Sequence, residues 1–190
     1  MEKRQYNIGI IVGSLRKASY CLKMAEFIGQ AGPQNFRYSL INIEELPIYN
    51  EDLETESPPV AWLDFRNAIR HQDGILFITP EYNRSVPAVL KNAIDVGSAP
   101  HGKNVFESKP AAIISLSPGK MGAFGANHHL RQSLVFLNMP VMQQPEAYIG
   151  NSAEIFGEGS AIQVESIRHF ITQFMEAFSG WVARQKKELN

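Results

Sequence analysis

Short apolar runs alternate along the chain with longer segments in which apolar residues recur every three or four positions. The short runs cover residues 6–12, 36–43, 74–79 and 110–116, and a fifth, interrupted run covers 141–149. Such nearly continuous apolar runs are typical of strands that are buried on both faces of a parallel sheet. The pattern therefore predicts five parallel strands.

The longer segments predict helices between these strands, at residues 20–30, 60–71, 87–97, 127–138 and 160–185. Pro87 suits the first turn of the third helix, where its missing N–H is not needed. An aromatic stripe on the last helix predicts core or subunit packing, and it consists of Phe170, Phe174, Phe178 and Trp181. Strands that alternate with helices over 190 residues predict a single α/β domain, with helices on both faces of the sheet.

Composition and charge narrow the class of protein. The chain is 44% hydrophobic and 19% charged, with a formal net charge of -1, so it lacks the basic surplus of a nucleic-acid binder. Its one cysteine, Cys21, excludes an internal disulfide and a cysteine-based metal cluster. No apolar run reaches the roughly 20 residues that a membrane span needs, and the first run belongs to a strand rather than to a signal peptide. We therefore expect a cytoplasmic protein with neither nucleic acid nor membrane as partner.

The chemistry is expected in the loops that follow the strands, because open parallel sheets bind ligands beyond the carboxyl ends of their strands. The first loop, "GSLRKASYC", offers the hydroxyls of Ser14 and Ser19, the charges of Arg16 and Lys17, and the free N–H groups of a helix N-terminus. These groups favour a phosphate. The loop has neither the GxxxxGK[ST] nor the GxGxxG spacing, so it predicts a monophosphate site. The alternative is that Ser19 only caps the helix while both cations face solvent.

The second loop, "TPEYNRSVP", is bracketed by two prolines that stiffen it. A rigid loop with backbone donors suits the edge of a flat heteroaromatic ring, which Glu81, Tyr82 and Asn83 would line. The alternative is an ordinary strand-to-helix turn in which Asn83 or Ser85 caps the helix.

The third loop, "SPGKMGAFGANHH", contains three glycines spaced by three residues. Ser117 and Gly119 would lie at the ring edge if the first two loops bind one molecule. For Gly122 and Gly125, simple chain flexibility is the favoured interpretation. The histidines at 128 and 129 would point in different directions on a helix, so no metal site is expected.

Three segments in this order resemble the NADPH-dependent FMN reductase family, and in particular its bacterial chromate and quinone reductase branch. They are "GSLRKAS", "TPEYNRSVPAVLKNAID", and "SPG" followed by "HLRQ". The resemblance covers essentially the whole chain. It implies a flavodoxin-like three-layer sandwich with strand order 2-1-3-4-5, bound FMN, and reduction of quinones and other small acceptors by NADPH or NADH. It also implies a homodimer, with a homotetramer as the alternative, and the segments 44–58, 87–97 and 127–138 are candidate interface elements.

The resemblance also assigns cofactor-binding residues. In the phosphate loop they are Ser14, Arg16, Lys17, Ser19, Tyr20 and Cys21. At the isoalloxazine ring they are Pro80, Glu81, Tyr82, Asn83 and Arg84, together with Ser117. No side chain is expected to be catalytic, because the flavin carries the chemistry at its N5 atom. Donor and acceptor would use the same face of the ring in turn, which is a ping-pong mechanism.

Three positions depart from the family pattern. Cys21 stands where members commonly carry asparagine, which predicts a weaker or backbone-only contact to the phosphate or ribityl chain. Val96 stands where tryptophan is frequent, and Gly125 where arginine is frequent. The change at Gly125 bears on subunit contacts or on recognition of the nicotinamide phosphate more than on FMN.

Other classes of protein fit less well or remain as alternatives. A phosphatase of the cysteine–arginine type needs an arginine six positions after its cysteine, and that position is Phe27. Flavodoxin electron carriers are typically strongly acidic, unlike this chain. A non-catalytic FMN-binding carrier or regulatory module remains the alternative to an enzyme.

Overall fold

The computed structural model describes residues 4–157 and 159–188 and contains a five-stranded parallel sheet in the order β2-β1-β3-β4-β5. The strands are β1 (Tyr6–Val12), β2 (Phe36–Leu40), β3 (Gly74–Thr79), β4 (Ala111–Leu116) and β5 (Ala147–Ile149). The expected flavodoxin-like order is confirmed.

Two strands are shorter than the apolar runs predicted. β2 ends at Leu40, and the apolar residues Ile41 and Ile43 beyond it are buried in the core as part of a loop. β5 keeps only its last three residues, and Val141 forms an isolated bridge to Ala111. Pro145 interrupts this run, because proline removes the N–H that a continuous ladder would require.

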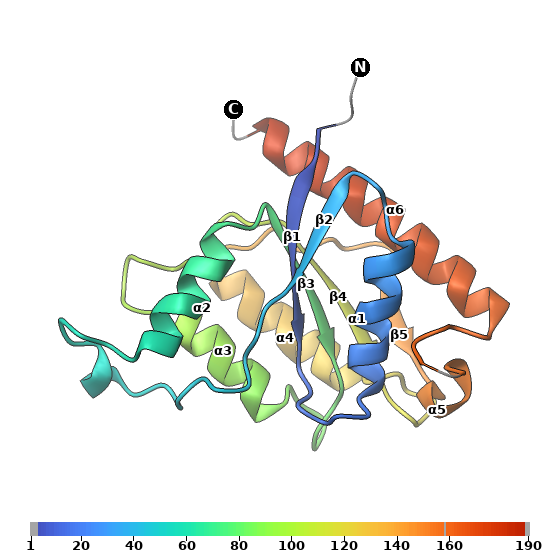
Figure 1. Cartoon of the computed structure of the whole chain (residues 1–190), viewed down its shortest axis with the longest axis horizontal. Coiled ribbons are helices and arrows are strands. Elements are labelled where there is room, and N and C mark those ends of the chain that lie inside the picture. The colour runs from blue at the N-terminus through green and yellow to red at the C-terminus, as the bar shows by residue number, and fades with distance from the viewer. Residues whose placement is uncertain (1–3, 158, 189–190) are drawn as a thin grey trace.

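The helices cover both faces of the sheet. They are α1 (Tyr20–Ala31), α2 (Val60–Arg70), α3 (Ala88–Ser98), α4 (Phe124–Phe136), α5 (Ser152–Ile155) and α6 (Glu165–Glu188), with a 3-10 turn η1 (Glu51–Leu53). Compared with the prediction, α4 and α6 are shifted by a few residues, while α5 and η1 were not expected. Pro87 immediately precedes α3 rather than forming its first turn. Figure 1 shows α1 and α6 on one side of the sheet and α2, α3 and α4 on the other.

Alternate residues of β1 enter the two halves of the core. Ile8 and Ile10 pack with α1 and α6, whereas Ile11 packs with α2, α3 and α4. From the aromatic stripe of α6, Phe174 and Phe178 are buried in the first of these clusters, and the other two rings pack against it. Each such side chain contributes about 1.5–3 kcal/mol when it is fully buried. The expectation that this stripe is core packing is confirmed.

The carboxyl ends of the strands meet at the lower edge of the sheet in Figure 1. Val12 pairs with Ile78, and Leu116 pairs with Ile149, so these strand ends lie at the same level. The loops after β1, β3, β4 and β5 are therefore brought together. In the described part of the chain, none of the helices is long and apolar enough to cross a membrane.

Candidate functional site

A hollow of about 240 Å³ lies at this edge and is lined by all three predicted loops. Its lining residues are Ser14, Arg16, Ser19, Tyr20, Cys21, Pro80, Glu81, Tyr82, Leu116, Ser117, Pro118 and Ser152. Most of the residues singled out in the sequence are thus brought together. Of the others, Lys17, Asn83, Arg84 and Gly119 do not line it. Leu116, Pro118 and Ser152 line it without having been predicted.

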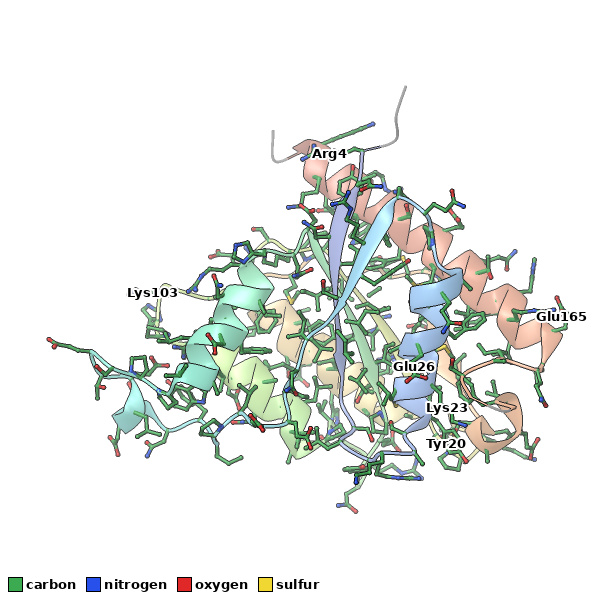
Figure 2. All side chains as sticks on the ribbon, in the orientation of Figure 1. Arg4, Tyr20, Lys23, Glu26, Lys103 and Glu165 are labelled. Carbon is green, nitrogen blue, oxygen red and sulfur yellow. The ribbon has the colours of Figure 1, made fainter. Side chains whose placement is uncertain are left out.

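The N-terminus of α1 is directed at the hollow. Ser19 is 3% exposed, and its Oγ accepts a hydrogen bond from the Leu22 N–H at 3.3 Å. The next N–H groups, those of Tyr20 and Cys21, have no partner within a helix. The first turn of α1 carries no acidic residue, so its partial positive charge is not neutralised there. Figure 2 shows Tyr20 at this lower end of α1, beside α5.

The capping role of Ser19 is therefore confirmed, and it is compatible with ligand binding. A hydroxyl oxygen that accepts one hydrogen bond still has its own O–H to donate. The Ser19 N–H is already used, since it donates to the Arg16 carbonyl at 3.1 Å. Ser19 consequently shapes the loop, and its O–H can donate either to a ligand in the hollow or to the Cys21 sulfur beside it.

The two cations of the first loop are both exposed but differ in position. Arg16 lines the hollow, and its Nη2 makes only a 3.5 Å contact to the Ala18 carbonyl. Lys17 lines a neighbouring depression of about 400 Å³ between this loop and the end of β2. Neither forms an ion pair within residues 4–157 and 159–188. The loop therefore has positive charge that other side chains do not neutralise.

Cys21 contributes no charge to the hollow. Its side chain is 2% exposed, and this burial raises the pKa of the thiol to about 12. A hydrogen bond with Ser19 lowers the pKa, but by less than burial raises it. The thiol is therefore neutral at physiological pH. A neutral group here does not repel an anion bound at the helix N-terminus.

The second loop forms a tight two-residue turn. The Tyr82 N–H donates to the Ser85 carbonyl at 3.1 Å, and the Ser85 N–H donates back at 3.0 Å. Asn83 and Arg84 have φ values of 51° and 64°, as the central residues of a type I′ turn require. The helix-capping alternative for Asn83 or Ser85 is wrong, because α3 follows Pro87 with no side-chain cap.

Glu81 links this turn to the start of α4 by a hydrogen bond. Its Oε2 accepts the Ala126 N–H at 3.0 Å, and its Oε1 pairs with Arg84 Nη1 at 3.3 Å. A carboxylate is stabilised at a helix N-terminus by the helix dipole. The Glu81 side chain is only 10% exposed, whereas that of Arg84 is 75% exposed. Glu81 thus holds Tyr82 and the turn in place beside the hollow.

Close approach, rather than chain flexibility, explains two glycines of the third loop. A Cβ at Gly125 would lie 2.9 Å from both the Arg84 carbonyl oxygen and Glu81 Oε2. A Cβ at Gly122 would lie 2.5–2.8 Å from backbone atoms of Tyr148 and Ile149, and its φ is 58°. The flexibility interpretation for both positions is therefore wrong.

Ser117 holds the third loop against the hollow. Its Oγ donates to the Gly119 carbonyl at 2.9 Å and accepts the Ala123 N–H at 3.2 Å. Gly119 itself is uncrowded, since a Cβ there would meet only Ser117 Oγ at 4.0 Å. Leu116 and Pro118 line the hollow as the chain neighbours of Ser117.

Ser152 is the polar residue that the sequence reasoning missed. It follows β5, so the same strand-end rule that identified the other loops would have found it. The interrupted apolar pattern over 141–149 obscured the end of that strand. Ser152 is fully buried, and its N–H donates to the Ser117 carbonyl at 3.0 Å.

The adjacent histidines of α4 have different partners. His128 Nε2 lies 3.0 Å from the Tyr148 hydroxyl, whereas His129 Nδ1 lies 3.1 Å from Ser85 Oγ. The described residues contain no group of three or more His, Cys, Asp or Glu side chains placed to hold a metal ion.

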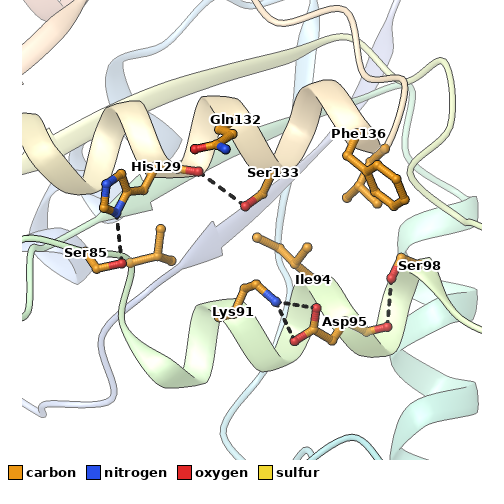
Figure 3. Close-up of a pocket in the computed structure, with 11 residues that line it drawn as sticks. Ser85, Lys91, Ile94, Asp95, Ser98, His129, Gln132, Ser133 and Phe136 are labelled. Atoms are coloured by element: carbon orange, nitrogen blue, oxygen red, sulfur yellow. Dashed lines mark hydrogen bonds and ion pairs between the residues drawn. The ribbon is translucent and has the colours of Figure 1, made fainter. Parts of the chain in front are cut away.

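A larger groove, of about 590 Å³, runs between α3 and α4 (Figure 3). It begins at Ser85, within the second loop, and ends at Phe136. On its α3 side, Lys91 Nζ and the Asp95 carboxylate form an ion pair at 2.6 and 2.8 Å, as their spacing of four residues on one helix predicts. It lacks the helix N-terminus and the free cation that favour an anion in the smaller hollow.

Comparison with known proteins gives consistent matches. The sequence profile of the family described as NADPH-dependent FMN reductase matches residues 6–154. A quinone reductase of Pseudomonas putida is 50% identical over 177 residues, which cover 93% of this chain and 95% of that protein. A 2-hydroxy-1,4-benzoquinone reductase of a Burkholderia species is 38% identical over 175 residues, which cover 92% and 95%. The solved structure of FerB, a flavoenzyme NAD(P)H:acceptor oxidoreductase of Paracoccus denitrificans, has a TM-score of 0.89 at 37% identity and covers 95% of this chain and 98% of that one.

Proposed function

Because this chain belongs to the NADPH-dependent FMN reductase family, and so is an oxidoreductase that uses FMN and NAD(P)H, we propose that it reduces quinones by a ping-pong mechanism. We also propose that the chain acts as a single domain and binds FMN in the hollow at the sheet edge. The observation that carries this proposal is the convergence of a donor-rich helix N-terminus and a rigid turn on one hollow. Two relatives that are named for quinone reduction support the choice of acceptor.

The first loop would hold the phosphate of FMN. The N–H groups of Tyr20 and Cys21 and the Ser19 hydroxyl provide donors, and Arg16 provides positive charge. Ser14 lies on the rim beside them. A phosphate at such a helix N-terminus is stabilised both by hydrogen bonds and by the helix dipole.

The second loop would hold the ring. FMN, when bound, supplies the redox chemistry by taking a hydride from NAD(P)H and passing two electrons to the acceptor. Glu81 keeps the turn rigid through Ala126, and Tyr82, at 49% exposure, offers an aromatic face beside the hollow. The N–H groups of Asn83 and Arg84 lie outside the two Tyr82–Ser85 hydrogen bonds, and they would stabilise negative charge at the ring edge where the ring extends past the hollow along this turn.

The kinetic test of this proposal is an initial-rate study of the FMN-loaded protein with NADPH and a soluble benzoquinone. If donor and acceptor occupy the same place in turn, double-reciprocal plots at several quinone concentrations give parallel lines. Free FMN at the same concentration serves as the control. Intersecting lines would contradict the ping-pong order. No quinone-dependent NADPH oxidation above the control would favour the regulatory module instead.

We further propose that a second copy of the chain covers the groove between α3 and α4, which gives a homodimer. Phe136, which lines one end of this groove, is 90% exposed, and its chain neighbour Val135 is 73% exposed; exposed apolar residues of this size mark interaction surfaces. Lys91 and Asp95 remain 52% and 38% exposed. Opposite charges in one patch are self-complementary about a twofold axis, because Lys91 of each copy can then lie against Asp95 of the other.

This arrangement would place the partner beside the second loop, since Ser85 lines both the turn and the groove. A homotetramer would need an additional surface.

We expect Phe136→Lys to convert the dimer to a monomer at micromolar concentration. The exposed ring would be lost from the interface, and two lysines would approach each other across the twofold axis. A lysine at the C-terminus of α4 is compatible with the helix dipole, so the fold should persist. Light scattering coupled to size exclusion gives the mass. Val164→Lys, at an exposed apolar position before α6, is the control and should remain dimeric. A wild type that is monomeric, or a variant that stays dimeric, would contradict the proposal.

A further inference from the structure

The hydroxyl of Ser152 is buried without a hydrogen-bond partner. The residue is 0% exposed, and its Oγ makes no hydrogen bond within the described part of the chain. Leaving a buried hydroxyl unpaired costs free energy, so buried polar atoms in proteins are almost always satisfied. An unpaired hydroxyl that lines a hollow indicates a ligand that completes its bonding.

The position of this hydroxyl is imposed by its neighbours. The Asn151 N–H donates to the Gly119 carbonyl at 3.3 Å, and the Ser152 N–H donates to the Ser117 carbonyl at 3.0 Å. Asn151 has a φ of 51°, and Gly150 packs so closely on Lys120 that a Cβ would lie 2.6 Å from the Lys120 carbonyl oxygen. The segment is thus held against the third loop, and Ser152 cannot turn away without breaking these contacts.

The same segment lies against the N-terminus of α1. The ring of Phe156, which follows α5, stacks on Tyr20 with centroids 6.0 Å apart and planes 9° apart. Ile155 of α5 shares a core cluster with Cys21. Ser152 therefore faces the hollow from beside the first turn of α1, where Ser19 and Arg16 also line it.

We propose that Ser152 is a phosphate-binding residue, whose Oγ–H donates a hydrogen bond to the phosphate of FMN. This inference rests on the proposed placement of the phosphate at the first loop, and it adds a donor from a fourth segment of the chain. At the end of the hollow next to α1, Arg16 and the Ser19 hydroxyl line it with Ser152, and the one lining carboxylate, Glu81, is already paired with the Ala126 N–H and Arg84. An acceptor with negative charge is therefore the partner that suits the Ser152 hydroxyl.

The variant Ser152→Ala should lower the affinity for FMN without lowering the stability of the apoprotein. The apoprotein should be as stable as wild type or more stable in urea, because an unpaired buried hydroxyl is removed. The affinity for FMN should fall by about tenfold or more, as expected for a lost hydrogen bond to a charged group. The affinity for riboflavin, which lacks the phosphate, should remain unchanged. Quenching of flavin fluorescence measures both affinities without catalysis.

Ser179→Ala provides a matched control, since Ser179 is a buried serine whose Oγ is paired with Asn35 at 2.9 Å. This variant should lose stability as apoprotein and keep its FMN affinity. An unchanged FMN affinity in Ser152→Ala, or an equal loss for FMN and riboflavin, would overturn the role of Ser152. A wild type with no preference for FMN over riboflavin would instead overturn the phosphate placement, and this inference with it.

Discussion

Replacing Gly122 with alanine is expected to destabilise the apoprotein by about 2–5 kcal/mol. The left-handed conformation, with a φ of 58°, costs an alanine about 1–2 kcal/mol. The added Cβ would also lie 2.5–2.8 Å from backbone atoms of Tyr148 and Ile149, which cannot rotate away as a side chain would. Overpacking of this kind typically costs about 1–3 kcal/mol.

The buried hydrogen bonds around Gly122 add to this effect. Ser115 Oγ lies 2.7 Å from the Gly122 carbonyl oxygen and 3.2 Å from that of Ala147, and Asn127 Nδ2 reaches the same hydroxyl at 3.2 Å. Moving the Gly122 carbonyl to relieve the clash would weaken this buried network. The loop that carries Ser117 would shift with it, so FMN affinity should also fall.

Urea unfolding of the apoprotein, followed by circular dichroism, measures the stability loss. Gly119→Ala is the matched control from the same loop, because its Cβ would meet only Ser117 Oγ at 4.0 Å. This control should change the free energy of unfolding by less than about 1 kcal/mol. Equal losses for the two variants would show that close approach is not what requires glycine at 122.

The sheet was predictable from the sequence because its strands are buried on both faces. β1 and β3 coincide with their apolar runs, and helices separate them at regular intervals. The strand order came from the resemblance to the family rather than from periodicity. The ends of β2 and β5 were not predictable from apolarity, since Ile41 and Ile43 are buried in a loop and Pro145 removes a backbone donor.

The site was predictable wherever a polar loop follows a clear strand end. Ser14, Glu81 and Ser117 each follow such a strand and line the hollow. Ser152 was missed because β5 is only three residues long and its apolar run is interrupted.

Long-range packing explains why the roles of Gly122 and Gly125 could not be predicted from the sequence. The atoms that crowd Gly122 belong to Tyr148 and Ile149, and those that crowd Gly125 belong to Glu81 and Arg84. Such distant partners leave no local pattern, so three glycines in a short loop predict flexibility when the sequence is taken alone.

We propose that one FMN lies at the sheet edge with its phosphate at the N-terminus of α1. The direct test compares the affinity of the wild-type apoprotein for FMN and for riboflavin, which differ only in the phosphate. Each hydrogen bond to a charged group contributes about 1.5–3 kcal/mol, and the loop offers several such donors. Riboflavin is the matched ligand, because its ring would meet the same second and third loops. Titration of flavin fluorescence should show FMN binding about 100-fold more tightly than riboflavin or better, at one molecule per chain. Equal affinity for the two flavins would show that the N-terminus of α1 does not hold the phosphate.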